Sequence, residues 1–185
     1  ENCLVMDTLS HASLPQKRKR VFMIATNRDY FIDNPILNDF SQCKVDMLEK
    51  YINLKIKKNE KYYLNQKNRF GAMLYENLKD RPQYSLAQLR KSYVREIPFG
   101  FCPTLTANMG TGGHNVPFLI DNFGLRKLTE EECFKLQGFS NSFKLPKSVS
   151  SSKTYEMIGN SVSPKISDII ARKVYSLLLQ ECSIK

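Results

Sequence analysis

The sequence has few of the residues that build metal sites and no long apolar run. Its five cysteines, at positions 3, 43, 102, 133 and 182, form no Cys-x-x-Cys pair, and it has two histidines, so we expect no metal site. Scattered cysteines of odd number fit a reducing compartment, where they act as small core residues. No stretch of eighteen apolar residues and no signal-peptide pattern is visible, so we expect no membrane contact and a cytoplasmic protein.

Glycine is missing from the first seventy residues, because all eight glycines lie between positions 71 and 159. Since glycine marks turns and close backbone approach, this predicts a regular front part and a loop-rich middle. No glycine-rich loop follows an early strand, so the usual loop of a nucleotide-type cofactor site is lacking. The chain begins at Glu1 and not at Met, which indicates a processed, trimmed or partial chain.

Positive charge is in excess. The 185 residues include 28 Lys and Arg against 18 Asp and Glu, a net charge of +10, and 42% of them are hydrophobic. This composition indicates one globular domain, or one domain and a piece of another. A small protein this basic usually binds a polyanion, and nucleic acid is the first candidate; a solvated basic surface is the alternative.

Apolar patterning predicts strands in the first part of the chain. Residues 3–9 and 21–26 are short apolar runs that we interpret as strands, and the second, which does not alternate, is expected to be buried on both faces. Scattered apolar residues predict a helix near 43–52. Residues 103–118 are interpreted as strand, glycine loop and strand, followed by a turn at 121–124.

The last third of the chain is predicted to contain two helices. Thr129 and Glu132 form a capping box that opens the first, which we expect to stop at Gly138. Residues 148–153 are a serine-rich connector. Pro164 opens the final helix, whose apolar stripe needs a partner surface. The stripe consists of Ile166, Ile169, Ile170, Val174, Leu177 and Leu178.

Residues 62–100 mix tyrosines with basic residues. On loops or short strands such side chains can stack on bases and pair with phosphates. They can equally be strand residues whose rings pack into a core, which is the commoner case. The residues concerned are Tyr62, Tyr63, Arg69, Tyr75, Arg81, Tyr84, Arg90, Lys91, Tyr93 and Arg95.

Two strings near the end of the chain are the most specific. Residues 126–139 read RKLTEEECFKLQGF, and Gly159-Asn-Ser-Val162 follows twenty residues after Phe139. Alone, the first is a capped helix and the second a turn of small residues. Together, at this spacing, they resemble the last two sequence blocks of the DNA cytosine-5 methyltransferases. The connector Gln16-x-Arg18-x-Arg20 resembles another block of that family.

The resemblance implies roles for the first and last blocks. Arg20 would contact the carbonyl oxygen of an extruded target cytosine, where a guanidinium stabilises developing negative charge. Arg18 would pair with backbone phosphate or support the catalytic acid. Asn160, Ser161 and Val162 would line part of a pocket for S-adenosyl-L-methionine, most of which would lie on a partner segment.

Thr104-Leu105 and the glycine loop after it resemble the target-recognition core of the family, although such a loop can be a plain hairpin turn. Its glycines would let the backbone approach DNA edges, and its polar side chains would read bases. The resemblance implies a mostly architectural role for the block from Arg126 to Phe139, which would order the recognition region against the catalytic domain, with Arg126 and Gln137 still able to reach phosphate or the space left by the flipped base. The expected DNA-recognition residues are Gln16, Thr104, Asn108, Gly110, Thr111, Gly112, Gly113, His114, Asn115, Arg126 and Gln137.

The nucleophile of the family lies in a Pro-Cys dipeptide and its catalytic acid in Glu-Asn-Val. This chain has Cys102-Pro103, in the reverse order, and a Glu1-Asn2-Cys3 that lies too close to Gln16. We therefore expect a C-terminal part that is inactive alone and works with a segment carrying the nucleophile. A separate subunit is favoured; a front part that was cleaved or left out, and a non-catalytic DNA-binding remnant, stay open.

The predicted fold class is α+β. Residues 1–28 would form the edge of a Rossmann-like catalytic domain, residues 29–145 a mostly β target-recognition domain with short helices, and residues 146–185 a return segment whose helix packs on the catalytic domain. The expected partners are double-stranded DNA and the N-terminal catalytic segment of the methyltransferase. The resemblance further implies a bacterial or phage-encoded restriction–modification enzyme that flips its target base.

Overall fold

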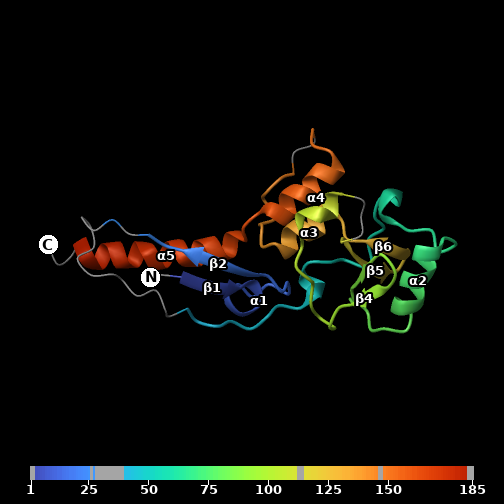
Figure 1. Ribbon diagram of the computed structural model, residues 1–185, viewed down its shortest axis with the longest axis horizontal. Helices are drawn as coiled ribbons and strands as arrows, with labels where there is room; N and C mark the ends of the chain where they lie inside the picture. Colours follow the sequence, from blue (N-terminus) through green and yellow to red (C-terminus); the bar gives the residue numbers. More distant parts are fainter. Residues whose placement is uncertain (1–2, 26, 28–39, 112–114, 146–147, 183–185) are drawn as a thin grey trace.

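The computed structural model describes residues 3–25, 27, 40–111, 115–145 and 148–182. The molecule mixes helix and sheet and is elongated (Figure 1). One end holds strands β1 (Cys3–Asp7) and β2 (Lys19–Met23), the short helix α1 (Thr8–His11) and the long helix α5 (Pro164–Cys182). The other end holds helix α2 (Arg69–Leu78) and strands β3 (Ala87–Leu89), β4 (Val94–Glu96), β5 (Pro117–Asp121) and β6 (Gly124–Lys127). Helices α3 (Glu130–Leu136) and α4 (Ser151–Asn160) lie between the two ends.

Strands β1 and β2 form an antiparallel ribbon in which Cys3 lies opposite Met23 and Val5 opposite Val21. One face of the ribbon packs on α5. The other face is bare: Val5 is 63% exposed, Val21 60% and Met23 85%. The prediction that the second strand is buried on both faces is therefore wrong, because within the described residues the cluster with α5 covers one face of the ribbon and leaves the other exposed.

Helix α5 begins at Pro164, as predicted, and its apolar stripe packs on the strands of the same chain. Leu178 is 37% exposed and lies outside this cluster. No helix among the described residues combines the length and apolarity needed to cross a membrane. The cluster joins Leu4, Met6, Ala12, Leu14 and Ile166 with the partly buried Phe22, Ile169, Ile170, Val174 and Leu177.

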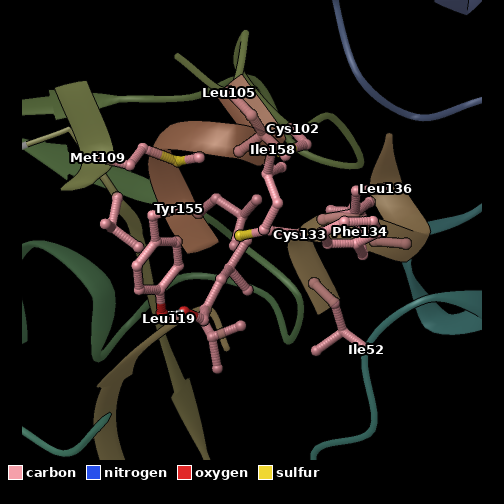
Figure 2. Close-up of a cluster of buried hydrophobic side chains, with 14 of the residues drawn as sticks. Ile52, Cys102, Leu105, Met109, Leu119, Cys133, Phe134, Leu136, Tyr155 and Ile158 are labelled. Carbon is pink, nitrogen blue, oxygen red and sulfur yellow. Dashed lines mark hydrogen bonds between the residues drawn. The ribbon is translucent and has the colours of Figure 1, made fainter. Parts of the chain in front are cut away.

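The main hydrophobic core lies between the four-stranded sheet and helices α3 and α4. Figure 2 shows Tyr155 and Ile158, both from α4, among the side chains of this core. The Tyr155 hydroxyl donates a hydrogen bond to the Leu128 carbonyl over 2.6 Å. Helix α4, which follows the domain boundary predicted at residue 146, thus contributes two side chains to this core.

The sheet has the strand order β4-β3-β5-β6, and every pair in it is antiparallel. The predicted turn at 121–124 is confirmed: Oδ1 of Asp121 accepts hydrogen bonds from the amides of Phe123 (2.8 Å) and Gly124 (3.0 Å). Helix α3 has the predicted capping box of Thr129 and Glu132 and stops before Gly138, whose φ is +97°. A left-handed residue of this kind is a usual helix stop.

Two predicted elements are not formed. The region 43–52 contains one 3-10 turn, Leu48–Lys50, and no α-helix. The amides of Cys43 and Asp46 instead donate to the carbonyls of Ser10 (2.7 Å) and Ser13 (2.9 Å), so this stretch runs along residues 10–13. The strand predicted at the start of 103–118 is also absent, because its backbone bonds to the side chain of Gln16 and not to a neighbouring strand.

The serine-rich connector is shorter than predicted. Ser150 caps α4, its hydroxyl accepting from the Lys153 amide over 3.2 Å, so 151–153 are already helical. Gly159, expected to admit a ligand, lies in the last turn of α4, where an added Cβ would sit 2.0 Å from the Ala107 nitrogen. At Gly110, in the 3-10 turn Ala107–Gly110, an added Cβ would sit 2.3 Å from the Ser152 carbonyl oxygen. Both glycines thus permit α4 to touch this turn.

The close contact of Gly159 with Ala107 predicts that adding one methyl group at position 159 destabilises the fold. Gly159→Ala should lower the free energy of unfolding by about 1–3 kcal/mol or more, since the Cβ meets backbone atoms that cannot rotate away. Lys153→Ala, at an exposed position of the same helix, should change it by less than about 0.5 kcal/mol. Urea unfolding followed by circular dichroism measures both. A Gly159→Ala variant as stable as the unmodified chain would contradict the packing.

Candidate functional site

The Gln16-x-Arg18 connector passes through the middle of the molecule. Gln16 is fully buried. Its Nε2 donates to the Leu136 carbonyl (3.0 Å) and to Oε1 of Gln137 (2.8 Å), and its Oε1 accepts from the Leu105 amide (3.1 Å). One side chain thereby joins the connector, the segment after residue 102 and the end of α3.

Arg18 is 4% exposed and extends the same junction. Its Nη1 donates to the Leu105 carbonyl (2.7 Å), and its Nη2 donates to the carbonyls of Gly159 (3.0 Å) and Ser161 (2.8 Å). Burial, with a smaller effect of the nearby Arg20 charge, lowers the pKa of Arg18 to about 10. Because the guanidinium already serves three carbonyls, the geometry favours a positioning role over the expected phosphate contact.

A hollow of about 140 Å³ lies beside this junction. It brings the predicted catalytic residues Arg18 and Arg20 together with the predicted cofactor residues at positions 160–162. Asn160, Val162 and Arg20 are exposed, whereas Ser161 is half-buried. The residues that line the hollow are Met6, Thr8, Arg18, Arg20, Val21, Phe22, Asn160, Ser161, Val162, Ser163 and Ile166.

The hollow fits one wall of a ligand site. Small-molecule pockets usually measure about 300–1,000 Å³, so the rest of such a site would come from elsewhere. Two of its residues, Arg18 and Ser163, carry a buried polar atom, Nε and Oγ respectively, with no hydrogen-bond partner in the described part of the chain. Ser161 is less available, because its Oγ donates to the Ile158 carbonyl (2.7 Å) and accepts from Nε2 of Gln137 (3.1 Å).

Three expected DNA-recognition residues are structural. Gln16, Arg126 and Gln137 are each 0% exposed. Gln137 bonds to Gln16 and, through Nε2, to the Ser161 carbonyl (2.9 Å). Because these three side chains are buried and already bonded within the protein, the structure favours an architectural role for them over contact with DNA.

Arg126 is the centre of a buried charge network. Its Nη1 and Nη2 donate to the two carboxylate oxygens of Glu132 (2.8 and 2.9 Å), and its Nε donates to Asp121 (2.6 Å). Burial alone would lower the pKa of Arg126, but the hydrogen bonds to Glu132 and Asp121 outweigh it and raise the pKa. The Arg-x-x-Thr-x-x-Glu string thus fixes helix α3 to the β5–β6 hairpin.

The remaining recognition candidates are nearer the surface. Oγ1 of Thr104 donates to the Lys17 carbonyl (2.6 Å), and Oγ1 of Thr111 to the Asn108 carbonyl (3.2 Å). The side chains of Asn108 and Thr111 are exposed, whereas Gly110 packs on α4. Oδ1 of Asn115 accepts from Nη1 of Arg90 (2.7 Å). Gly112, Gly113 and His114 lie outside the described residues.

Thr8 and Ser163 line the hollow but were not predicted from the sequence. Thr8 is the first residue of α1, and its hydroxyl donates to the Gln16 carbonyl. Ser163 directly precedes α5. No local pattern distinguishes a serine or threonine that lines a hollow from one that caps a helix, so only the folded arrangement identifies them.

A larger hollow, of about 690 Å³, lies between residues 58–62, α3 and the segment after it. Phe134, Phe139 and Phe143 line it, with ring centroids 4.5 to 5.2 Å apart. It contains neither predicted arginine and none of the predicted cofactor residues. Its size alone therefore does not make it the functional site.

The arrangement of elements is that of solved methyltransferases. The Entamoeba histolytica methyltransferase EhMeth superposes with a TM-score of 0.56 at 22% identity, over 96% of this chain and 53% of that chain. The S. pombe Dnmt2 methyltransferase gives a TM-score of 0.57 at 17% identity, over 97% of this chain and 55% of that chain. At these identities the likeness shows the fold alone.

The sequence comparison places the chain in a family. Residues 8–176 match the family described as C-5 cytosine-specific DNA methylase, and the chain belongs to it. The Type II methyltransferase M.Bsp6I of Bacillus sp. (strain RFL6) is 35% identical over 179 residues, 95% of this chain and 55% of the relative. M.DsaV of Dactylococcopsis salina is 29% identical over 170 residues, 90% of this chain and 45% of the relative. This chain spans about half the length of these relatives.

The junction predicts that lysine cannot replace Arg18. A single ammonium cannot serve the carbonyls of Leu105, Gly159 and Ser161 together, so at least one buried acceptor would lose its donor. Arg18→Lys should therefore lower the free energy of unfolding by about 1–3 kcal/mol. Arg20→Lys, the same exchange on an exposed residue, should change it by less than about 0.5 kcal/mol. Equal urea midpoints for the two variants would contradict the inferred stabilising role of Arg18 in the junction.

Proposed function

We propose that this chain is the C-terminal, DNA-recognising part of a DNA cytosine-5 methyltransferase. It would act on a cytosine turned out of duplex DNA, because the ring atoms cannot be reached inside the stack. S-adenosylmethionine, when bound, supplies the methyl group. The observation that carries the proposal is the hollow in which Arg18, Arg20 and the Asn160–Val162 segment meet, in a chain of this family.

The chain's own residues would hold the substrate and support charge. The exposed Arg20 lies at the hollow, where its guanidinium would stabilise negative charge that develops on the cytosine carbonyl oxygen. The buried Arg18 would keep the Ser161 backbone in place for the cofactor wall. Asn160 and Val162 would complete that wall, and the exposed polar residues at 104–115 would face the DNA.

The reactive thiol would come from a partner segment that carries Pro-Cys. Cys102 does not fit that role, because it is 0% exposed and burial raises the pKa of its thiol well above the ordinary value. A thiol acts as a nucleophile only when it is ionised. Cys133 is also fully buried, and burial raises its pKa as well.

A partner surface is available on the β1–β2 ribbon. Most of the α5 stripe packs on the ribbon, whereas Leu178, near the end of the helix, is 37% exposed. The opposite face of the ribbon, with Val5, Val21 and Met23, is apolar and exposed. Exposed apolar area of this kind often marks an interaction site. We propose that the catalytic segment covers this face and extends the ribbon into a Rossmann-like sheet.

Methyl transfer tests the proposal directly. The chain would be assayed alone and together with the polypeptide encoded upstream of it that carries Pro-Cys and Glu-Asn-Val, with labelled S-adenosylmethionine and duplex DNA. We expect transfer only for the pair, with the methyl group on cytosine carbon five. Turnover by the purified chain alone would contradict the dependence on a partner. DNA binding with no methyl transfer even in the presence of that polypeptide would favour the non-catalytic remnant.

Arg20 can be tested in the active pair. Loss of one group that stabilises charge on a reacting oxygen commonly lowers turnover by about 10²–10³-fold, and we expect this for Arg20→Ala with DNA affinity largely kept. Lys19→Ala removes a neighbouring exposed cation and should leave turnover nearly unchanged. Single-turnover rates at saturating DNA separate chemistry from binding. Unchanged turnover in Arg20→Ala would show that this residue does not stabilise the reacting cytosine.

A further inference from the structure

The four-stranded sheet has one face on α2 and one face turned away from it. Ala87 and Leu89 of β3 pack in a cluster with Leu74 and Leu78 of α2. Side chains alternate along a strand, so Gln88 belongs to the other face. Arg95 of β4 is paired with Gln88 in the register and shares that face.

This second face is buried at one side of the sheet and open at the other. Leu119 and Arg126, from β5 and β6, are covered by the main core. At the β4 side, Tyr93 is 58% exposed, and Lys91 and Arg95 are also exposed. Within the described part of the chain, no hydrogen bond or ion pair engages these three side chains.

The β3–β4 hairpin is bonded on its β3 side to Asn115, one of the recognition candidates. Arg90 Nη1 donates to Asn115 Oδ1 (2.7 Å), and Gln88 Nε2 donates to the Asn115 carbonyl (2.8 Å). Arg90 Nη2 also donates to Gln88 Oε1 (3.3 Å). The three-residue network holds Asn115 against β3, so Asn115 lies beside the β3–β4 hairpin.

The structure also separates the two interpretations of the tyrosine- and arginine-rich stretch. Tyr62 donates to Glu130, and Tyr63 donates to Asp121 (3.0 Å). Arg81 donates to the Ile97 carbonyl (2.7 Å). These side chains stabilise the fold. The side chains of Lys91, Tyr93 and Arg95, in and just before β4, make no such bond within the described part of the chain, so they are available for a ligand.

We propose that Lys91, Tyr93 and Arg95 form a second contact with duplex DNA, beside the recognition candidate Asn115. The two cations would meet phosphates, and the tyrosine hydroxyl would donate to a phosphate oxygen. Glu96 does not cancel this charge, because it lies on the opposite face and accepts from Nδ2 of Asn77 (3.0 Å). The contact positions DNA and does not read its sequence. This inference rests on the proposed function, because it assumes that the chain grips DNA.

Salt-dependent binding of the 185-residue chain to a fluorescent duplex tests the inference. Each phosphate contact contributes about 0.9 to the slope of log affinity against log salt, so Lys91→Ala/Arg95→Ala should reduce the slope by about 1.8. Tyr93→Phe should weaken binding roughly fivefold at fixed salt, because it removes one hydrogen bond, and should leave the slope unchanged. Circular dichroism confirms that each variant is folded.

The matched control is Lys67→Ala/Arg69→Ala, which removes two exposed cations at the start of α2, on the other side of the sheet. Its slope should equal that of the unmodified chain. If Lys91→Ala/Arg95→Ala has the slope of the unmodified chain, the proposed contact is wrong while DNA recognition stands. The same conclusion follows if the salt slope falls equally in the two double variants. If the unmodified chain does not bind the duplex, the DNA-recognition role and this contact are both wrong.

Discussion

The buried junction of Gln16 and Arg18 is the interaction on which the arrangement of this molecule depends. Two polar side chains of one connector, two positions apart, bond to residues near positions 105, 136 and 160, which are far apart in the sequence. Buried polar groups are costly unless they are paired, so the five hydrogen bonds of these side chains to backbone groups fix one relative placement of the segments. The β1–β2–α5 end and the sheet end are joined through this junction.

The placement explains why functional candidates and structural residues are mixed within the same short blocks. In the connector, Arg18 is buried and positions the backbone, while Arg20, two residues later, is exposed at the hollow. At the end of α4, Gly159 packs on Thr106 and Ala107, while Asn160 and Val162 remain exposed. Each block therefore supplies both a fixed support and an accessible group. A ligand wall built this way needs little reorganisation when a substrate binds.

Much of the local structure could be predicted because it depends on short-range rules. The capping box of Thr129 and Glu132, the stop at Gly138 and the start of α5 at Pro164 are confirmed. The burial of Arg126 and Gln137 could not be predicted, because it depends on partners brought together by the fold. The helix expected near 43–52 fails for the same reason, since its amides bond to a distant segment. Apolar pattern likewise could not reveal that only one face of β2 is covered.

If one connector holds the segments around Leu105 and residues 159–161 in a single arrangement, amide hydrogen exchange in a Gln16→Ala variant tests this most directly. We expect protection to fall together at the Leu105 amide and in residues 159–161, while the β5–β6 hairpin keeps its protection. A loss confined to residues 15–18, with Leu105 and the end of α4 as protected as in the unmodified chain, would contradict it.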